Sequence, residues 1–340
     1  MCANGWKMTD RLSVVAIEGD GIGHEVFQAM QRVVNHVMDH RIDWIPAFAG
    51  LECAEANGGN PLPQETLDLI RLHRVAIKGP TTTPSGGGFK SVNVRLRQEL
   101  ELHSCVRPAI HIPGLPKSHP CDVMVVREGV EGYYDCFEVR EGDVVHVTAH
   151  FSKAAFKRTV RKAVKIALSR RGKLTLVLKT NILKQWGALY TEAFNEVIAE
   201  DGRGLETNYL HIDALSMMLE MYPERFDVLV TENLFGDILS DMTAGIVGGL
   251  GVAPGACIGD AYAIFEAVHG SAPDIAGRGI ANPTAIILSA AMMLEYDGFL
   301  RPAKYLREAL LRTIAEGDRT GDMGGTLNTE QFTDAILRRL

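Results

Sequence analysis

The sequence lacks the features that mark several large classes of protein. No two of its six cysteines form a C-x-x-C pair, which argues against a zinc site and favours reduced thiols over a disulfide framework. No uninterrupted apolar run reaches membrane-spanning length, and residues 1–10 lack the apolar segment of a signal peptide. A formal net charge of −7 disfavours nucleic acid or an anionic membrane as the main partner. We therefore expect a cytoplasmic protein that binds neither.

What the chain does contain is typical of a globular α/β protein. Its 340 residues, 46% of them hydrophobic and 23% charged, can form a core large enough for two domains. Short apolar runs predict buried strands, with stretches of helical spacing between them. This alternation predicts an α/β fold. The predicted strands span residues 12–17, 74–78, 122–127, 174–179 and 227–231.

Two segments depart from this simple alternation. Residues 136–140 and 144–151 are strand-like and are joined by the turn Glu141-Gly142-Asp143, so we predict an inserted hairpin that serves a subunit contact. Further along, Asn282-Pro283 is a typical helix start, with a cap followed by a proline. The apolar stretch 285–296 would form that helix before a glycine ends it.

A short basic and polar segment follows the second predicted strand. On a helix, Asn93 and Arg97 would share a face, with Ser91 at the helix start, where free N–H groups suit an anion. Arg97, together with Arg107 and the later Arg127, can hold carboxylates through planar, two-pronged hydrogen bonds. In an acidic chain this pattern predicts a pocket for a small polyanionic substrate. The alternative is that these arginines make ordinary ion pairs at the surface.

Two acidic residues have the spacing of a metal site. Asp237 and Asp241 are four residues apart in a segment predicted to be helical from about Asp237, so both carboxylates would face the same way. Beside an anionic substrate they predict a site for Mg²⁺ or Mn²⁺. Neither acid, nor Asp213 earlier in the chain, has a cationic partner nearby in sequence. The alternative is one helix cap and one solvated acid, and Asp213 carries no meaning by itself.

Other candidates are weaker when taken alone. Lys179 ends a predicted strand, a suitable position for a crevice in an α/β protein, and a partly desolvated lysine can act as a base, although most lysines are simply solvated. Tyr134 can donate a proton or merely pack. The glycines of residues 19–23 lack the G-x-G-x-x-G spacing of a dinucleotide fingerprint. The turn-rich loop 266–277 is long enough to wrap a cofactor.

Taken together, these segments resemble the isocitrate/isopropylmalate dehydrogenase family of β-decarboxylating dehydrogenases. The motifs occur in the family's order over nearly the whole chain, which makes the combination specific although each motif alone is weak. Ser91-Val92-Asn93 matches the isocitrate branch, so the closest resemblance is to NAD-dependent isocitrate dehydrogenase. The matching segments are residues 19–23, 78–108, 127–134, 179–181, 232–241 and 266–282.

The resemblance implies a two-domain α/β fold of the isocitrate/isopropylmalate dehydrogenase type, which is not a Rossmann fold. Residues 1–102 and 248–340 would form the large cofactor-binding domain. Residues 103–247 would form the small dimerisation and substrate domain, with the hairpin 136–151 as a clasp. The implied assembly is a homodimer whose active sites are shared between the subunits.

The implied reaction is the NAD- and divalent-metal-dependent oxidative decarboxylation of isocitrate to 2-oxoglutarate and CO₂, a step of the tricarboxylic acid cycle. Homoisocitrate or another 3-substituted malate is the alternative substrate. An alternative of a different class is a non-catalytic regulatory subunit of a heteromeric dehydrogenase. Such a subunit should have lost a catalytic residue, whereas Tyr134, Lys179 and the three aspartates are all present here.

The resemblance also assigns roles to matching positions of this chain. Tyr134 would protonate the enolate, and Lys179 of the neighbouring subunit would assist proton removal from the substrate hydroxyl. Asp237 and Asp241, with Asp213 of the neighbour, would hold Mg²⁺ or Mn²⁺. The substrate carboxylates would be bound by Ser91, Asn93, Arg97, Arg107 and Arg127. The cofactor would be bound by Thr83, Asn181, His269, Gly270, Ser271, Ala272, Asp274, Ile275 and Asn282.

Two positions distinguish this chain from some relatives. NADP-using relatives have lysine and tyrosine where this chain has Asp274-Ile275. A carboxylate there can accept hydrogen bonds from ribose hydroxyls and would repel a 2′-phosphate, so the resemblance implies NAD. The family usually has an asparagine where this chain has Gly129, so a contact of that asparagine with cofactor or substrate is not expected here.

Overall fold

The computed structural model describes residues 11–84, 89–116 and 118–340. Its strands coincide with short runs of apolar and β-branched residues, most of them buried. In chain order the strands are β1 (Leu12–Ile17), β2 (Ile42–Pro46), β3 (Val75–Lys78), β4 (Ser104–Ile110), β5 (Asp122–Glu128), β6 (Phe137–Glu141), β7 (Val144–Thr148), β8 (Lys173–Leu178), β9 (Glu206–His211), β10 (Val228–Thr231), β11 (Pro254–Ile258) and β12 (Ala263–Ala267).

Most helices bury one apolar face, and α9 is buried over most of its surface. The α-helices are α1 (Gly23–Val37), α2 (Leu51–Ala56), α3 (Gln64–His73), α4 (Val92–Glu99), α5 (Lys153–Leu168), α6 (Lys184–Asp201), α7 (Ile212–Met221), α8 (Asn233–Ile246), α9 (Thr284–Tyr296), α10 (Leu300–Ala315) and α11 (Thr329–Leu337). Short 3-10 helices are η1 (Gly132–Asp135), η2 (Pro223–Arg225), η3 (Leu250–Val252) and η4 (Gly321–Met323). No helix in the described part of the chain is both long and apolar enough to cross a membrane.

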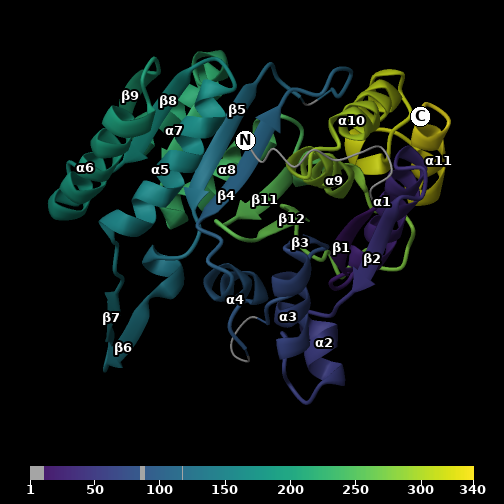
Figure 1. Cartoon of the computed structure of the whole chain (residues 1–340), viewed down its shortest axis with the longest axis horizontal. Coiled ribbons are helices and arrows are strands. Elements are labelled where there is room, and N and C mark those ends of the chain that lie inside the picture. Colours follow the sequence, from purple (N-terminus) through teal and green to yellow (C-terminus); the bar gives the residue numbers. More distant parts are fainter. Residues whose placement is uncertain (1–10, 85–88, 117) are drawn as a thin grey trace.

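Ten strands form one mixed sheet in the order β2-β1-β3-β12-β11-β4-β5-β10-β8-β9 (Figure 1). The outer strands pair in parallel, whereas β12, β11, β4 and β5 pair antiparallel in the middle. Residues 1–102 and 248–340 supply the first five strands of this order, and residues 103–247 supply the other five. The two predicted domains thus correspond to two halves of the sheet that meet at the β11–β4 pair, and the division into domains stays a prediction.

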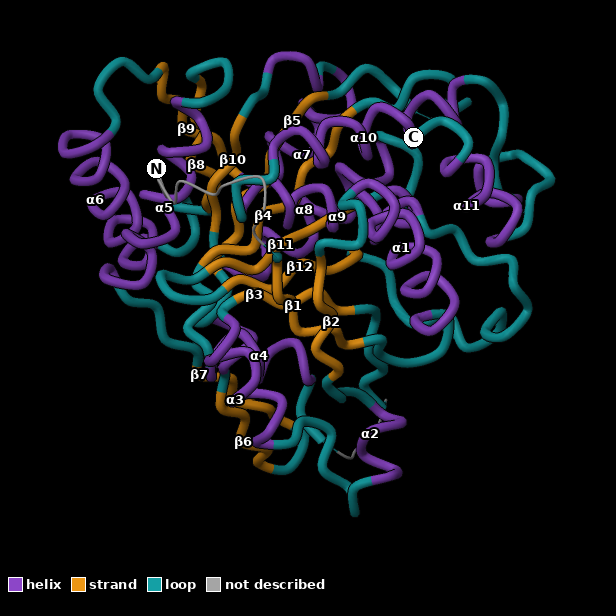
Figure 2. Tube along the Cα trace, turned by 45° about the vertical axis from the view of Figure 1, so that its right-hand side comes forward, coloured by secondary structure: helices purple, strands orange, loops and turns teal. Residues whose placement is uncertain are grey.

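Helices cover both faces of each half (Figures 1 and 2). In the first half, α1, α9, α10 and α11 pack on one face, and α3 and α4 pack on the other. Val14 and Ala16 of β1 face the first layer while Val15 and Ile17 face the second, the alternation expected of a strand buried on both sides. In the second half, α5 and α6 pack on one face, and α7 and α8 pack on the other.

The predicted strands and the hairpin are confirmed, with ends shifted by a few residues. The turn between β6 and β7 is Gly142-Asp143, and Gly142 has a φ of +61°, in the left-handed region that favours glycine. β7 ends at Thr148 rather than at residue 151. Figure 1 shows this hairpin extending away from the rest of the chain, and its residues are exposed.

Two helix starts differ from the prediction. α8 begins at Asn233 rather than near Asp237, because the Glu232 carboxylate accepts hydrogen bonds from the first free N–H groups of the helix. α9 begins at Thr284, whose N–H donates to the side-chain oxygen of Asn282 at 3.0 Å. The Asn282 side chain therefore accepts from the first residue of the helix, but the N-cap residue is Pro283, so the predicted helix start is wrong by one position.

Candidate active site

Three buried arginines line a pocket of about 250 Å³. Arg97 comes from α4, Arg107 from β4 and Arg127 from β5, and these residues are 5%, 7% and 2% exposed. Nη2 of Arg97 and both Nε and Nη1 of Arg107 are buried without a hydrogen-bond partner. Because an unpaired buried donor is unfavourable, these nitrogens mark a place for an anionic group. Ser91 and Asn93 line the same pocket, so all five predicted substrate residues are brought together.

Glycines allow the arginines to lie against the backbone. A Cβ at Gly255 of β11 would lie 2.1 Å from Nη1 of Arg107, and a Cβ at Gly236 of α8 would lie 2.6 Å from the Cβ of Arg127. A side chain at Gly255 would force the Arg107 guanidinium to move, and one at Gly236 would collide with the first carbons of the Arg127 side chain. A Cβ at Gly129 would lie 2.4 Å from a backbone carbonyl oxygen, so the asparagine usual in the family does not fit this backbone.

A buried cluster of charges lines one part of the pocket. Glu266 of β12 accepts hydrogen bonds from Lys78 at 3.0 Å and from Arg107 at 2.9 Å. Burial alone would raise the pKa of Glu266, but the two cations outweigh it and lower the pKa to about 2. The charged carboxylate therefore offsets cations that would otherwise be uncompensated in the interior. Sequence analysis missed Lys78 and Glu266, although each lies near the end of a buried strand, the signal that identified Lys179.

The acidic side chains of α8 line the same pocket. Asp237 accepts hydrogen bonds from Arg127 and from the hydroxyl of Tyr134, and the Tyr134 ring centroid lies 4.6 Å from the Arg127 guanidinium carbon. Burial, followed by the hydrogen bond to Asp237, raises the pKa of Tyr134, which keeps its hydroxyl protonated. Burial, followed by the charge of Asp237, raises the pKa of Asp241. A divalent cation fits these two oxygen ligands because it would relieve their repulsion.

Lys179, the other predicted catalytic residue, and Asp213, the third predicted metal ligand, lie outside this pocket. Lys179, just after β8, donates a 2.7 Å hydrogen bond to Asp213 at the start of α7. This hydrogen bond lowers the pKa of Asp213. None of the three aspartates has a cationic residue nearby in sequence, but the fold brings Arg127 to Asp237 and Lys179 to Asp213. Residues 11–84, 89–116 and 118–340 hold no group of three or more His, Cys, Asp or Glu side chains that could bind a metal.

A larger pocket of about 780 Å³ adjoins the arginine pocket at His269 and Gly270. Of the predicted cofactor residues, Ala272, Ile275 and Asn282 also line it. Burial lowers the pKa of His269, and its buried Nε2 has no hydrogen-bond partner, so this nitrogen is available to a ligand. A pocket of this size, mostly apolar with a few polar groups, suits a dinucleotide.

The other predicted cofactor residues do not line this pocket. The Ser271 hydroxyl lies 2.6 Å from that of Thr82, which ties the loop after β12 to the loop after β3. Thr83, Asp274 and Asn181 are exposed.

Asp322 is a charged residue of the larger pocket that the sequence analysis missed. Asp322 lines the larger pocket and accepts a 2.9 Å hydrogen bond from Asn282, yet no motif or spacing in the sequence singles it out.

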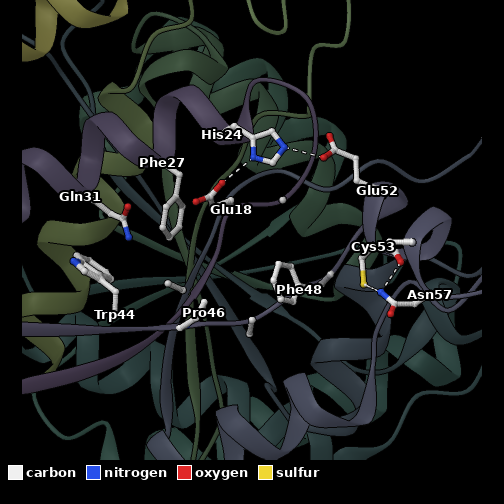
Figure 3. Close-up of a pocket in the computed structure, with 15 residues that line it drawn as sticks. Glu18, His24, Phe27, Gln31, Trp44, Pro46, Phe48, Glu52, Cys53 and Asn57 are labelled. Atoms are coloured by element: carbon white, nitrogen blue, oxygen red, sulfur yellow. Dashed lines mark hydrogen bonds and ion pairs between the residues drawn. The ribbon is translucent and has the colours of Figure 1, made fainter.

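A third pocket, of about 580 Å³, lies beside the loop after β1 and has aromatic walls (Figure 3). His24 lies 2.8 Å from both Glu18 and Glu52. The hydrogen bond with Glu18 is the main cause that raises the pKa of His24. None of the predicted site residues lines this pocket, so we do not include it in the candidate active site.

Comparisons with known proteins agree with this geometry. The profile of the isocitrate/isopropylmalate dehydrogenase family matches residues 13–336. An isocitrate/homoisocitrate dehydrogenase of Thermus thermophilus is 45% identical over 331 residues, which cover 96% of this chain and 98% of that protein. A 3-isopropylmalate dehydrogenase of Archaeoglobus fulgidus is 43% identical, covering 96% and 99%. The crystal structure of isocitrate dehydrogenase from Methylococcus capsulatus superimposes with a TM-score of 0.91 at 42% identity, covering 96% and 99%.

Proposed function

The chain belongs to the isocitrate/isopropylmalate dehydrogenase family, and from this premise we propose that it catalyses the NAD- and divalent-metal-dependent oxidative decarboxylation of isocitrate to 2-oxoglutarate and CO₂. One observation carries the choice of substrate: the pocket presents unpaired buried guanidinium nitrogens of Arg97 and Arg107 beside the polar Ser91 and Asn93. A tricarboxylate can accept hydrogen bonds from all of these donors.

The cofactors would occupy the adjoining parts of this site. Asp237 and Asp241, with Asp213 of a second copy, would hold Mg²⁺ or Mn²⁺, and the pocket at residues 269–282 would hold NAD. When bound, the metal polarises the oxygen of the reacting carbon and the nicotinamide accepts a hydride.

The protein's own side chains would then orient the substrate and move protons. The arginines hold the carboxylates in one orientation, which lowers the entropic part of the barrier. Lys179 of a second copy would help remove the hydroxyl proton. Tyr134, whose raised pKa keeps it protonated, would deliver a proton to the enolate carbon after CO₂ leaves.

The test of this proposal is a substrate panel with the purified chain, Mg²⁺ or Mn²⁺, and NAD. We expect kcat/KM for isocitrate to exceed that for 3-isopropylmalate at least tenfold, because an isopropyl group would leave polar partners unpaired at roughly 1–3 kcal/mol each. Comparable values for the two substrates would overturn the assignment. Absence of activity from the single chain with any substrate would favour the regulatory-subunit alternative.

Homoisocitrate is the second candidate substrate, because a relative 45% identical to this chain bears the name isocitrate/homoisocitrate dehydrogenase. Homoisocitrate differs from isocitrate by one methylene, and such a difference separates substrates by only about 10–200-fold. If kcat/KM in the same panel were higher for homoisocitrate than for isocitrate, homoisocitrate would be the main substrate and isocitrate the secondary one.

We expect NAD to be preferred over NADP by at least tens-fold in kcat/KM. Asp274 and the pocket residue Asp322 both carry carboxylates that would repel a 2′-phosphate. Replacing Asp274 by Lys together with Ile275 by Tyr should narrow or invert this ratio, whereas Asp274→Asn should shift it less. If the wild-type enzyme preferred NADP, the assumption that the loop carrying Asp274 lies beside the adenosine ribose of the cofactor would be wrong.

We also propose that the active site is completed by a second copy of the chain. Lys179 and Asp213 sit together on the second half of the sheet but outside the pocket that holds Tyr134 and Asp237. Large apolar side chains are exposed on the β6–β7 hairpin, in the loop after β8, and on α7 and α8, as a subunit interface requires. They are Phe137, Val144, Val145, Val147, Ile182, Met217, Met221 and Ile238.

Mixing two inactive variants tests this sharing. Tyr134→Phe and Lys179→Met should each be nearly inactive alone. Co-expression should restore about one quarter of wild-type activity, because half of the dimers would be mixed and each mixed dimer would have one intact site. If each active site belonged to a single chain, no mixture of the two variants would recover activity.

A further inference from the structure

Two cysteines face each other where the two halves of the sheet meet, and the proposed reaction uses neither. Cys105 of β4 and Cys257 of β11 are register partners in an antiparallel pair, and their Sγ atoms lie 3.1 Å apart. Both side chains are buried. Cys53, Cys121 and Cys136 make no such contact with another cysteine within the described residues.

The backbone around this pair suits a disulfide. Directly opposed residues of antiparallel strands have Cα atoms about 4.5–5.5 Å apart, within the range of about 4.4–6.8 Å that disulfides span. The sulfurs need to approach by only about 1 Å to reach the bond length of about 2.05 Å. The bond would join residues 152 positions apart in sequence and would link the two predicted domains covalently.

The surroundings favour the thiolate of Cys105 rather than that of Cys257, whose pKa is raised by the hydrogen bond with Cys105 and by burial. The hydrogen bond with Cys257 lowers the pKa of Cys105, and the guanidinium groups of Arg97, Arg127 and Arg107 lower it further, against the effect of burial. The thiolate is the form that attacks an oxidant, so cations around a cysteine make it more reactive than an ordinary buried thiol.

A small cavity lies beside the cysteine pair. Cys257 lines a cavity of about 10 Å³, room for roughly one water molecule. The walls of this cavity are shared with the arginine pocket at Lys78, Asn93, Arg97 and Glu266. These shared side chains separate the arginine pocket from Cys257, and hydrogen peroxide that passed them would meet the pair at Cys257, whose Sγ lies 3.1 Å from that of Cys105.

We propose that Cys105 and Cys257 form a peroxide-sensitive dithiol that closes to a disulfide across the β4–β11 junction. The Cys105 thiolate attacks one oxygen of hydrogen peroxide, which breaks the O–O bond, releases hydroxide and gives a sulfenic acid. The Cys257 sulfur then attacks the Cys105 sulfur, the S–S bond forms, and the second oxygen leaves as water. Two thiols and one peroxide give one disulfide and two waters, so the thiols lose two electrons and the peroxide gains them.

The test is peptide mapping of the full-length protein. Reduced wild-type protein is treated with hydrogen peroxide, its free thiols are alkylated under denaturing conditions, and the digest is analysed by mass spectrometry without reductant. We expect a cross-linked peptide that contains both Cys105 and Cys257 and that disappears on treatment with dithiothreitol. The oxidised protein should also have a Tm higher by on the order of 5 °C, because the bond closes a long loop.

Matched variants give the controls. Cys257→Ser should abolish both the cross-linked peptide and the rise in Tm, whereas Cys121→Ser, at another buried cysteine, should keep both. The proposal is overturned if peroxide leaves both thiols alkylatable in the wild-type protein, or if it converts Cys105 to a sulfinic acid without any cross-link. The wild-type map decides this even if a variant folds poorly.

Discussion

Asp237→Asn should lower kcat for isocitrate oxidation by at least about 10²-fold, because the Lewis-acid contribution of a bound divalent metal amounts to several kcal/mol and depends on a full carboxylate charge. Asp237 also accepts hydrogen bonds from Arg127 and Tyr134. The substitution therefore weakens the hydrogen bonds that hold these two site residues in place. The measurement is steady-state kinetics across a range of Mg²⁺ and Mn²⁺ concentrations. Partial recovery at high Mn²⁺ is expected, since one oxygen ligand remains.

A surface carboxylate provides the control for this prediction. Asp68 lies on α3, where its side chain is 61% exposed and pairs with Arg71, so Asp68→Asn should leave kcat unchanged. Wild-type enzyme should in turn lose its activity in excess chelator and regain it when Mg²⁺ or Mn²⁺ is added back. Full activity in excess chelator would refute a metal role for Asp237 and Asp241.

Arg107→Lys should lower kcat/KM for isocitrate by about 10–150-fold. Lysine keeps the charge that balances Glu266 but cannot present the two guanidinium nitrogens, Nε and Nη1, that are buried without partners. Losing one charge-assisted hydrogen bond to a substrate carboxylate costs about 1.5–3 kcal/mol. We expect most of the effect in KM if the contact is equally strong in ground and transition states, and in kcat if it tightens as CO₂ leaves.

The same substitution can be made at an arginine outside the pocket. Arg170 pairs with Asp122 and Asp227 on the second half of the sheet. Arg170→Lys should therefore lower the midpoint temperature of unfolding but leave KM for isocitrate unchanged. A loss of isocitrate affinity as large as that of Arg107→Lys would show that the kinetic effect reflects general destabilisation. An unchanged kcat/KM in Arg107→Lys would mean that the unpaired nitrogens do not bind substrate.

Local signals were enough to find half of the strands of the large sheet, the hairpin and most of the arginine pocket. Apolar runs and turn residues identified β1, β3, β5, β8, β10 and the β6–β7 hairpin, because burial on both faces demands continuous apolar sequence and a tight turn demands a glycine such as Gly142. Helical spacing placed Asn93 and Arg97 on one face of α4, and both line the arginine pocket. The start of α8 was missed because its cap is Glu232, whose acceptor role depends on backbone geometry.

For other site residues, local signals do not show which residues they meet. Lys78 and Glu266 are 188 positions apart in sequence and meet only because β3 and β12 are neighbours in the sheet. Gly255 and Gly236 look like any other glycine until the two arginines that lie over them are known. Asp322 lines the larger pocket and accepts a hydrogen bond there from Asn282, which is 40 positions away in sequence.

The sequence by itself determined the α/β class, the hairpin, the residue types of an anion and metal site, and the resemblance to a family, because periodicity, turns and ordered motifs are properties of neighbouring positions. Only the tertiary structure decided which charges meet. It paired Arg127 with Asp237 and Lys179 with Asp213, left nitrogens of Arg97 and Arg107 unpaired, and set Cys105 opposite Cys257. The physical reason is that the pairing of charges and thiols depends on distances of a few ångströms, and strand order, which brings together residues remote in sequence, fixes those distances.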